Sequence, residues 1–490
     1  MDWKKLAPPW KLTLFRRFFF VNLVVLQYGI DSTLWLPTVY AFINTLVDHS
    51  RVTYYLSLTQ LLPTVVQFFV SILVGPLVSY FGTSLKWPMF VFLLCSAAGN
   101  FLYSCAGIHG IDNVWAIIGG RMLSGLASGS SSLSMVYIVK SSSTEERLPA
   151  LSWFRTFAGV ALGLGPLLSI PLTRFSFHIG KYTVNETNAP TFVASGIAIV
   201  VAITICAAVK NKMSNKVNVF SIFLKHHDQL MEHGMTSLLA PVIMMFLLFV
   251  SSFLMANVLF LISSLLRSPD HWDLGLTLIS GLQTVIFFMS LLASLCTSKL
   301  HASFMSWTNQ FVPRACLYFT HANYDSKKKE KLIASLLPEL SIPVFSFLCT
   351  IIGSILVIVS LEVLDHASSN KVGSVVCFLI GCTIMMMAYN IQAAFLPSLY
   401  TKTLPSELRI ALTPWYGAMV ALGKLAAPPI VEAIGTSSNT VGGWIGSQGF
   451  CIALTLIGAI VLCVSVPRII EVIIFRNVPQ NLNPHEIKVS

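Results

Sequence analysis

Long apolar runs, separated by short polar segments, dominate the pattern of this chain. A bilayer core about 30 Å thick needs about 20 apolar residues for one helix to cross it. Runs of that length predict twelve membrane-spanning helices, over residues 18–46, 54–80, 88–108, 113–138, 150–172, 190–209, 238–265, 273–297, 341–363, 373–400, 410–433 and 444–466. The pattern therefore predicts an all-α membrane protein with twelve transmembrane helices.

The composition agrees with a chain that is surrounded by lipid. Hydrophobic residues make up 55% of the 490 positions and charged residues only 10%, whereas a soluble domain carries about 25% charged residues. A soluble enzyme and a nucleic-acid-binding protein are excluded on this ground, and the lipid bilayer is the expected partner. The ten cysteines form no CxxC pair, so neither a disulfide framework nor a zinc site is predicted.

The distribution of basic residues orients the predicted bundle. The chain carries 31 Lys and Arg against 20 Asp and Glu, a net charge of +11. With both termini in the cytoplasm, 23 of the basic residues fall in inner segments and five in outer loops, which is the bias of the positive-inside rule. The sequon at Asn185 then lies in an outer loop, where we expect glycosylation. Only a net +1 is left inside the spans.

Two segments 262 residues apart resemble each other and divide the chain into halves. Residues 140–166 and 402–428 share five identities at equal spacing, among them Lys140 with Lys402 and Arg147 with Arg409. Internal repeats of this kind are common in transporters. The predicted organisation is a six-helix half, a cytoplasmic linker and a second six-helix half, over residues 1–209, 210–237 and 238–490. Three histidines in the linker, His226, His227 and His233, fit a solvated segment better than a metal site.

The end of the second predicted span carries a glycine motif. Residues 75–82 read Gly-Pro-Leu-Val-Ser-Tyr-Phe-Gly, and this stretch resembles the signature loop of the major facilitator superfamily. In that family an Asp in the loop caps a neighbouring helix and holds one gating state. Ser79 stands at the Asp position here, so the resemblance implies a gating motif of Gly75, Ser79 and Gly82 without a charged latch.

Two further motifs carry the same resemblance. The stretch from Gly120 through Arg121 to Gly125 is similar to the family's helix-4 motif, whose Arg lines the cavity of the first half and is linked to coupling. Gly165 and Pro166 are similar to its helix-5 motif. The resemblance implies two pseudo-symmetric six-helix halves that alternate in access. Small residues at these spacings also pack helices closely, so helix packing is an alternative role for these motifs.

Within the superfamily, the chain resembles the branch of lysosomal ceroid-lipofuscinosis-type proteins. The resemblance rests on Leu36-Pro37, on the Gly-Arg-Met-Leu-Ser-Gly stretch and on Thr144-Glu-Glu-Arg147. It implies a multi-pass protein of the endolysosomal membrane. Neither terminal segment contains an acidic dileucine signal, so the plasma membrane is the alternative location.

Charged residues inside the predicted spans are candidate functional residues, because each costs at least about 2.5–3.5 kcal/mol at the centre of a helix. Counting about 1.5 Å per residue from the span ends places Asp31, Arg121 and Lys424 at one level, in the outer half of the membrane. We expect Asp31 and Arg121 to pair in a central cavity, with Lys424 adding positive potential. This site suits an anion, or a proton carried by Asp31. A structural ion pair that joins two helices is the alternative.

Arg155 lies closer to the inner edge of its span, about 12 Å deep. Two interpretations stay open for it: contact with a leaving substrate, and a side chain that extends to water at the membrane surface. The chain contains no GxxxxGK[ST] loop and no HExxH or GxSxG motif. We therefore predict no cofactor, no metal site and no enzymatic activity.

The predicted function is secondary transport of a small solute by alternating access, either of an anion or coupled to protons. The expected partners are a small molecule or ion as substrate and the bilayer, and the chain is expected to act as a monomer without binding nucleic acid. The alternative is a receptor or adaptor that uses the same scaffold without transport. The altered signature loop keeps this alternative open.

Overall fold

A computed structural model of the chain describes most of its length. The described residues are 9–36, 38–48, 51–81, 84–107, 113–142, 146–172, 177–179, 182–185, 187–209, 239–265, 272, 276–308, 310, 326–366, 371–405, 408–436 and 441–477. The predicted linker with its three histidines therefore lies outside the described residues, and so does Gly82.

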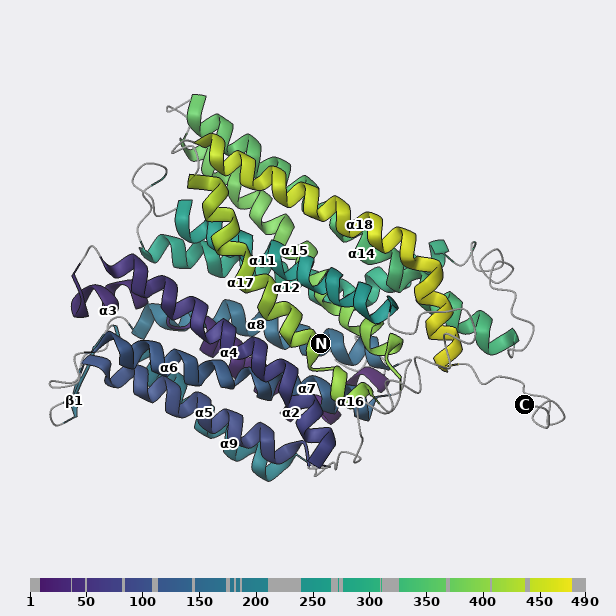
Figure 1. Cartoon of the computed structure of the whole chain (residues 1–490), viewed down its shortest axis with the longest axis horizontal. Coiled ribbons are helices and arrows are strands. Elements are labelled where there is room, and N and C mark those ends of the chain that lie inside the picture. Colours follow the sequence, from purple (N-terminus) through teal and green to yellow (C-terminus); the bar gives the residue numbers. More distant parts are fainter. Residues whose placement is uncertain are drawn as a thin grey trace.

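The first half of the described chain is a helical bundle with one small hairpin (Figure 1). Its helices are α2 (Pro9–Thr33), α3 (Val39–Leu46), α4 (Val52–Phe81), α5 (Lys86–Ser104), the 3₁₀ turn η2 (Cys105–Gly107), α6 (Val114–Leu126), α7 (Ser128–Ser141), α8 (Arg147–Leu172) and α9 (Ala189–Ala208). Strand β1 (Phe177–Ile179) pairs antiparallel with β2 (Tyr182–Val184). Helix α2 packs on α7, α8 and α9, while α5 packs on α6, α7 and α9.

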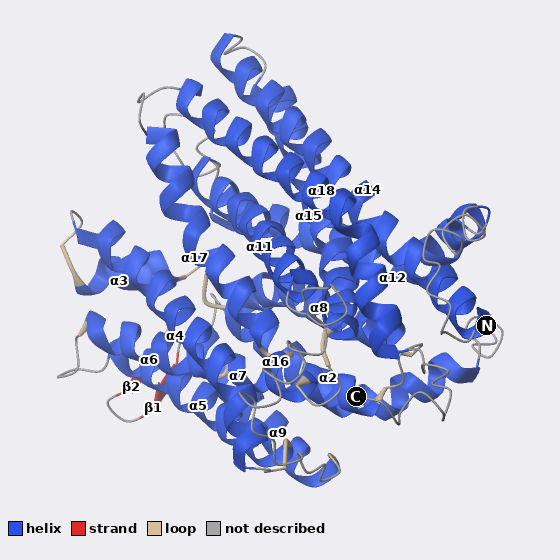
Figure 2. Ribbon diagram, turned by 45° about the vertical axis from the view of Figure 1, so that its right-hand side comes forward, coloured by secondary structure: helices blue, strands red, loops and turns tan. Residues whose placement is uncertain are grey.

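The described residues of the second half form helices and no strand (Figure 2). They are α11 (Leu239–Leu265), α12 (Leu276–Thr308), α14 (Ser326–His366), α15 (Lys371–Thr403), α16 (Arg409–Leu412), α17 (Trp415–Thr436) and α18 (Val441–Asn477). Helix α14 packs on α15 and α18, and α11 packs on α15, α17 and α18.

The helices confirm the predicted all-α membrane fold. Ten helices of the described chain are long and apolar enough to cross a bilayer, and the number rises to eleven if the bent helix α12 is one span. Helix α2 adds a shorter apolar segment, Phe18–Thr33. The predicted twelve spans are compatible with these helices, although the helices do not fix that number.

Three predicted spans are each divided into two helices. Residues 18–46 form α2 and α3, residues 113–138 form α6 and α7, and residues 410–433 form α16 and α17. Pro37 and Pro414 account for two of the breaks, because proline lacks an amide hydrogen and disfavours helical geometry in the preceding residue. The third break is at Ala127, where the nearby Gly125 and Gly129 have low helix propensity.

The halves meet along two sets of helices. Helix α8 of the first half packs on α12 and α15, and α4 packs on α16 and α17. In Figure 1 the yellow-green α17 accordingly lies beside the purple α4. These contacts place α8 and α17 at the junction of the halves, where each carries one of the predicted functional cations.

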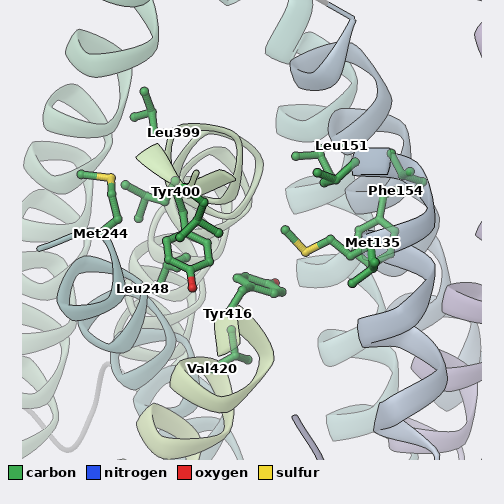
Figure 3. Close-up of a cluster of buried hydrophobic side chains, with 14 of the residues drawn as sticks. Met135, Leu151, Phe154, Met244, Leu248, Leu399, Tyr400, Tyr416 and Val420 are labelled. Atoms are coloured by element: carbon green, nitrogen blue, oxygen red, sulfur yellow. The ribbon is translucent and has the colours of Figure 1, made fainter. Parts of the chain in front are cut away.

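The largest cluster of buried apolar residues extends through both halves. Figure 3 shows part of it, with residues of α7 and α8 on one side and residues of α11, α15 and α17 on the other. The labelled side chains are Met135, Leu151, Phe154, Met244, Leu248, Leu399, Tyr400, Tyr416 and Val420. The polar clusters described below are embedded in this apolar packing.

Candidate functional site

Asp31 and Arg121 lie at the centre of a buried polar network inside the first half. Nη1 of Arg121, on α6, is 3.3 Å from Oδ1 of Asp31, on α2. The carboxylate also accepts hydrogen bonds from Ser96 and Asn100 of α5, each at 2.8 Å. Asp31 and Arg121 expose only 3% and 6% of their surface. Three helices therefore meet at one buried carboxylate.

The rest of this network also belongs to the first half. The guanidinium carbon of Arg121 lies 4.3 Å from the ring centroid of Trp35, which is within the range of a cation–π contact. Nη1 of Arg121 donates to Oδ1 of Asn100 at 3.4 Å, and Gln27 donates to Ser96 at 2.9 Å. The structure thus brings Asp31 and Arg121 together, between α2, α5 and α6.

Arg155 contacts the opposite half of the molecule. Its Nε donates to the backbone carbonyl of Ala393 on α15 at 2.8 Å. Its guanidinium carbon lies 4.9 Å from the ring centroid of Tyr416 on α17. Lys424, about two turns further along α17, interacts electrostatically with Arg155. The side chain of Arg155 therefore crosses the interface between the halves instead of extending to the membrane surface.

Neither Arg155 nor Lys424 has a carboxylate partner among the described residues. The ion pairs in that part of the chain are Arg121 with Asp31, Lys402 with Glu339, and Arg468 with Glu471. Nη2 of Arg155 is buried and makes no hydrogen bond there, and both cations are half-buried. Two like charges held together away from bulk water are unfavourable unless an anion or water lies close to them.

Two tyrosines connect the cations with the network of the first half. Tyr28, one turn before Asp31 on α2, interacts electrostatically with Asp31, Arg121 and Tyr389. Tyr389, on α15, interacts in turn with Arg155. Tyrosine hydroxyls both donate and accept hydrogen bonds. Tyr28 and Tyr389 are thus electrostatically coupled both to the network of the first half and to the cations at the junction.

The charge of this region exceeds the one predicted from the sequence. The prediction combined Asp31, Arg121 and Lys424 to give a net +1. In the structure Arg121 is neutralised by Asp31, while Arg155 joins Lys424. The groups between the halves therefore carry a net +2.

The segment that resembles the signature loop lies against the second half. A Cβ atom on Gly75 would overlap the carbonyl oxygen of Ala411 in α16, so the contact between α4 and α16 requires glycine here. Nε1 of Trp415 donates to the carbonyl of Ile72 at 3.2 Å. The hydroxyl of Ser79 is buried and has no hydrogen-bond partner in the described chain, so no helix cap is present there.

Gly165 and Pro166 lie where α8 approaches the C-terminal end of α2. A Cβ atom on Gly165 would overlap Oγ1 of Thr33. The carbonyl of Pro166 accepts a hydrogen bond from Ser169 at 2.7 Å. These two residues therefore set the packing of α8 beside the segment that carries Asp31.

Asn185 lies between β2 and α9. Its side-chain oxygen accepts hydrogen bonds from the amide and the hydroxyl of Thr187, at 3.1 and 2.7 Å. Only 7% of Thr187 is exposed. Glycosylation of Asn185 stays a prediction.

Asn100, Ser96 and Tyr389 were not predicted as site residues. Ser96 and Asn100 are four residues apart, so they share one face of a helix, and this polar face is a signal that identifies them. Tyr389 has no comparable signal, because its partner lies on a helix of the other half.

The chain is similar to known transporters. The family described as "Sugar (and other) transporter" matches residues 27–210. The chain is 26% identical over 429 residues to the MFS-type transporter PUL3 of Kluyveromyces lactis, which covers 86% of this chain and 91% of that protein. It is also 25% identical over 335 residues to an uncharacterized membrane protein of Saccharomyces cerevisiae, covering 65% of this chain and 94% of that protein.

Solved structures of transporters share the fold. The proton:xylose symporter XylE superposes with a TM-score of 0.66 at 12% identity, over 95% of this chain and 96% of that chain. The human organic anion transporter MFSD10 superposes with a TM-score of 0.63 at 12% identity, over 93% and 100%. PUL3 and the structural neighbours are described as transporters and not as enzymes, in agreement with the sequence-based prediction. The lysosomal branch is not confirmed by these matches, and the findings support the broader assignment, a major facilitator superfamily transporter.

Proposed function

We propose that the protein is a secondary transporter that carries a small organic anion through the junction of its halves. The observation that supports this proposal is the pair of cations, Arg155 on α8 and Lys424 on α17, which lack a carboxylate partner in the described chain. An anion that binds both cations contacts both halves at once. Its binding therefore favours a different arrangement of the halves from that of the empty protein, which is the requirement for alternating access.

The aromatic side chains around the cations indicate an anion with an organic body. The ring of Tyr416 stacks on Arg155, and Tyr389 interacts with the same guanidinium. Tyrosine offers both an apolar ring and a hydroxyl. A carboxylate or sulfonate with an apolar or hydroxylated portion fits this chemistry better than a bare halide. A structural neighbour, MFSD10, is described as an organic anion transporter, in line with this proposal.

Proton coupling is the second candidate, and Asp31 is the group that favours it. Its carboxylate is buried and is held by Arg121, Ser96 and Asn100. Protonation of Asp31 removes the charge that neutralises Arg121, and Tyr28 links this change to Tyr389 at the junction. Two structural neighbours, XylE and the fucose symporter FucP of E. coli, are described as proton symporters.

Membrane topology, oligomeric state and cellular location are further proposals. Both termini lie in the cytoplasm, on the strength of the 23 inner and five outer basic residues. The chain acts as a monomer, since the proposed path lies within one copy. Only the sequence resemblance supports an endolysosomal location. Fractionation of the tagged protein, compared with lysosomal and plasma-membrane markers, tests this location.

Counterflow in proteoliposomes tests the transport proposal. Purified full-length protein is loaded with monocarboxylates, dicarboxylates, sulfonates or neutral sugars, and tracer uptake is measured with and without a pH gradient. We expect uptake of an organic anion that Lys424→Gln lowers at least about tenfold, while Lys299→Gln, which neutralises an exposed lysine on α12, leaves it unchanged.

Two outcomes would contradict the proposal. Uptake of a neutral sugar alone, insensitive to Lys424→Gln, rules out an anionic substrate. No counterflow with any solute, together with cysteine accessibility that never changes sides, favours the receptor or adaptor. Proton coupling requires that the pH gradient accelerate uptake and that Arg121→Gln abolish this acceleration.

A further inference from the structure

A cavity of about 200 Å³ lies where α7, α8 and α16 meet. It is separate from the proposed transport site, because Arg147 in its wall precedes Arg155 by about two turns of α8. The polar side chains that line it are Lys140, Ser142, Arg147 and Arg409. The rest of its lining is aliphatic. Three cations are therefore among the described residues that line this cavity, and no carboxylate is among them.

Arg147 is the buried cation of this cavity. Only 2% of its surface is exposed, and its Nε and Nη1 atoms have no hydrogen-bond partner in the described chain. Arg409, from the other half, repels it electrostatically. The guanidinium of Arg409 itself donates to the carbonyls of Thr401 and Leu404, at 3.1 and 3.3 Å. A buried guanidinium with unused donors and a like charge beside it requires an anion for a favourable energy.

Glu339 is the carboxylate that attracts Arg147, but it forms its ion pair with Lys402. Glu339 attracts Arg147 electrostatically, but its Oε1 is 2.5 Å from Nζ of Lys402. Its Oε2 accepts a hydrogen bond from Ser398 at 3.5 Å. Glu339 thus neutralises Lys402 and forms no ion pair with Arg147 within the described residues. Glu339 therefore does not neutralise the positive charge of the cavity.

The two arginines come from equivalent places in the two halves. Arg147 begins α8 and Arg409 begins α16, and the two positions match in the 262-residue repeat. The cavity therefore lies across the junction, at the end where α7 and α15 finish. The positive end of the α8 dipole points to the same place.

We propose that this cavity binds a phosphate group, and that the bound group joins the two halves at this end of the bundle. Guanidinium groups present donors in a planar fork that matches phosphate oxygens, and Nε and Nη1 of the buried Arg147 are the donors available to it. The source is either inorganic phosphate or the headgroup of an anionic lipid. This binding site is independent of the substrate proposed above, because no residue is shared between the two.

Thermal unfolding of the full-length protein tests both sources. One arm titrates sodium phosphate against sodium chloride at constant ionic strength, with the protein in a neutral detergent. The other arm compares nanodiscs of phosphatidylcholine with nanodiscs that contain phosphatidic acid, in buffer free of phosphate. We expect a saturable rise of the unfolding temperature in at least one arm, and the responding arm identifies the source.

The variants decide whether this response comes from the cavity. Arg147→Gln and Arg409→Gln are each expected to weaken the apparent affinity at least about tenfold. Lys299→Gln, which removes an exposed lysine outside the cavity, is expected to change it less than about twofold. If Arg147→Gln does not fold, Arg409→Gln and Lys140→Gln provide the same comparison.

Three results would overturn the proposal. The first is no saturable response in either arm. The second is an Arg147→Gln or Arg409→Gln protein that responds like the parent. The third concerns Glu145 and Glu407, which precede the two arginines by two residues and lie outside the described chain. If binding appears only in the Glu145→Gln/Glu407→Gln protein, then the chain's own carboxylates occupy the cavity.

Discussion

Each half contains two helices that cross at a pair of glycines, but the polar side chains next to the crossing differ between the halves. In the first half Gly99 of α5 faces Gly120 of α6, and in the second half Gly353 of α14 faces Gly381 of α15. At each crossing a Cβ atom would lie within 2.5–2.8 Å of the opposite backbone oxygen. Glycine therefore permits backbone contact in both halves, as is typical of small residues at helix interfaces in membranes.

Among the described residues, an ion pair lies next to the crossing of the first half, where Asp31 and Arg121 lie with Asn100. The second half has a buried ion pair too, Lys402 with Glu339, but Glu339 lies about 20 Å along α14 from Gly353. A buried polar pair of the second half is neutral: Asn257 of α11 and Gln448 of α18 exchange hydrogen bonds of 3.5 Å and are fully buried. Since the second half packs its crossing without a charge, packing alone does not require the ion pair. The difference favours a functional role for Asp31 and Arg121 over a structural one.

Asp31→Leu is expected to have the largest effect on stability. It leaves Arg121 buried and charged without a carboxylate, and removal of one partner of a buried ion pair costs about 3–5 kcal/mol. We expect the free energy of unfolding, measured by SDS-driven unfolding in mixed micelles, to fall by that amount. The double variant Asp31→Leu/Arg121→Met is expected to recover most of the loss. A single variant as stable as the parent would show that the pair is not a strong contact.

Alanine at the two crossings is expected to have an intermediate and equal effect. In Gly99→Ala the new Cβ would lie 2.5 Å from the oxygen of Gly120, and in Gly353→Ala it would lie 2.8 Å from that of Gly381. Overpacking of this kind costs about 1–3 kcal/mol. Gly196→Ala in α9 is the matched control, because no atom lies within 4 Å of its Cβ position, and it is expected to gain up to about 1 kcal/mol from helix propensity. Unequal losses at the crossings would mean that the halves do not pack alike.

Asn257→Leu is expected to have the smallest effect. It removes a neutral interhelical hydrogen bond, and such bonds contribute about 0.6 kcal/mol on average inside membranes. The same SDS-driven unfolding measures the loss. A cost as large as that of Asp31→Leu would refute the distinction between the charged contact of Asp31 and the neutral contact of Asn257.

The fold and the contact of Asp31 with Arg121 follow from regular features of the sequence. Apolar runs of bilayer length locate the helices. A helix also rises by a fixed distance per residue, so positions counted from the span ends predict which charges lie at one level. The contacts of Asp31 with Ser96 and Asn100 cannot be predicted by this count, because they depend on which face of α5 lies against α2.

The proximity of Arg155 to Lys424 was not predictable in this way. Counting residues places Arg155 about 12 Å and Lys424 about 22 Å from the inner edge of the membrane. In the structure the two cations interact electrostatically. The chain is interrupted between α16 and α17, so a count along one continuous helix does not give their separation.

Helix α8 carries residues of three regions described above. Arg147 lines the cavity, Arg155 reaches α15 and α17, and Gly165 packs on Thr33 of α2. The spacings along the helix axis are about 12 and 15 Å. One inserted residue between Arg147 and Arg155 would turn them by about 100° relative to each other. The length of this segment is therefore itself constrained: point substitutions alter one region at a time, whereas an insertion or deletion disrupts the alignment of all three.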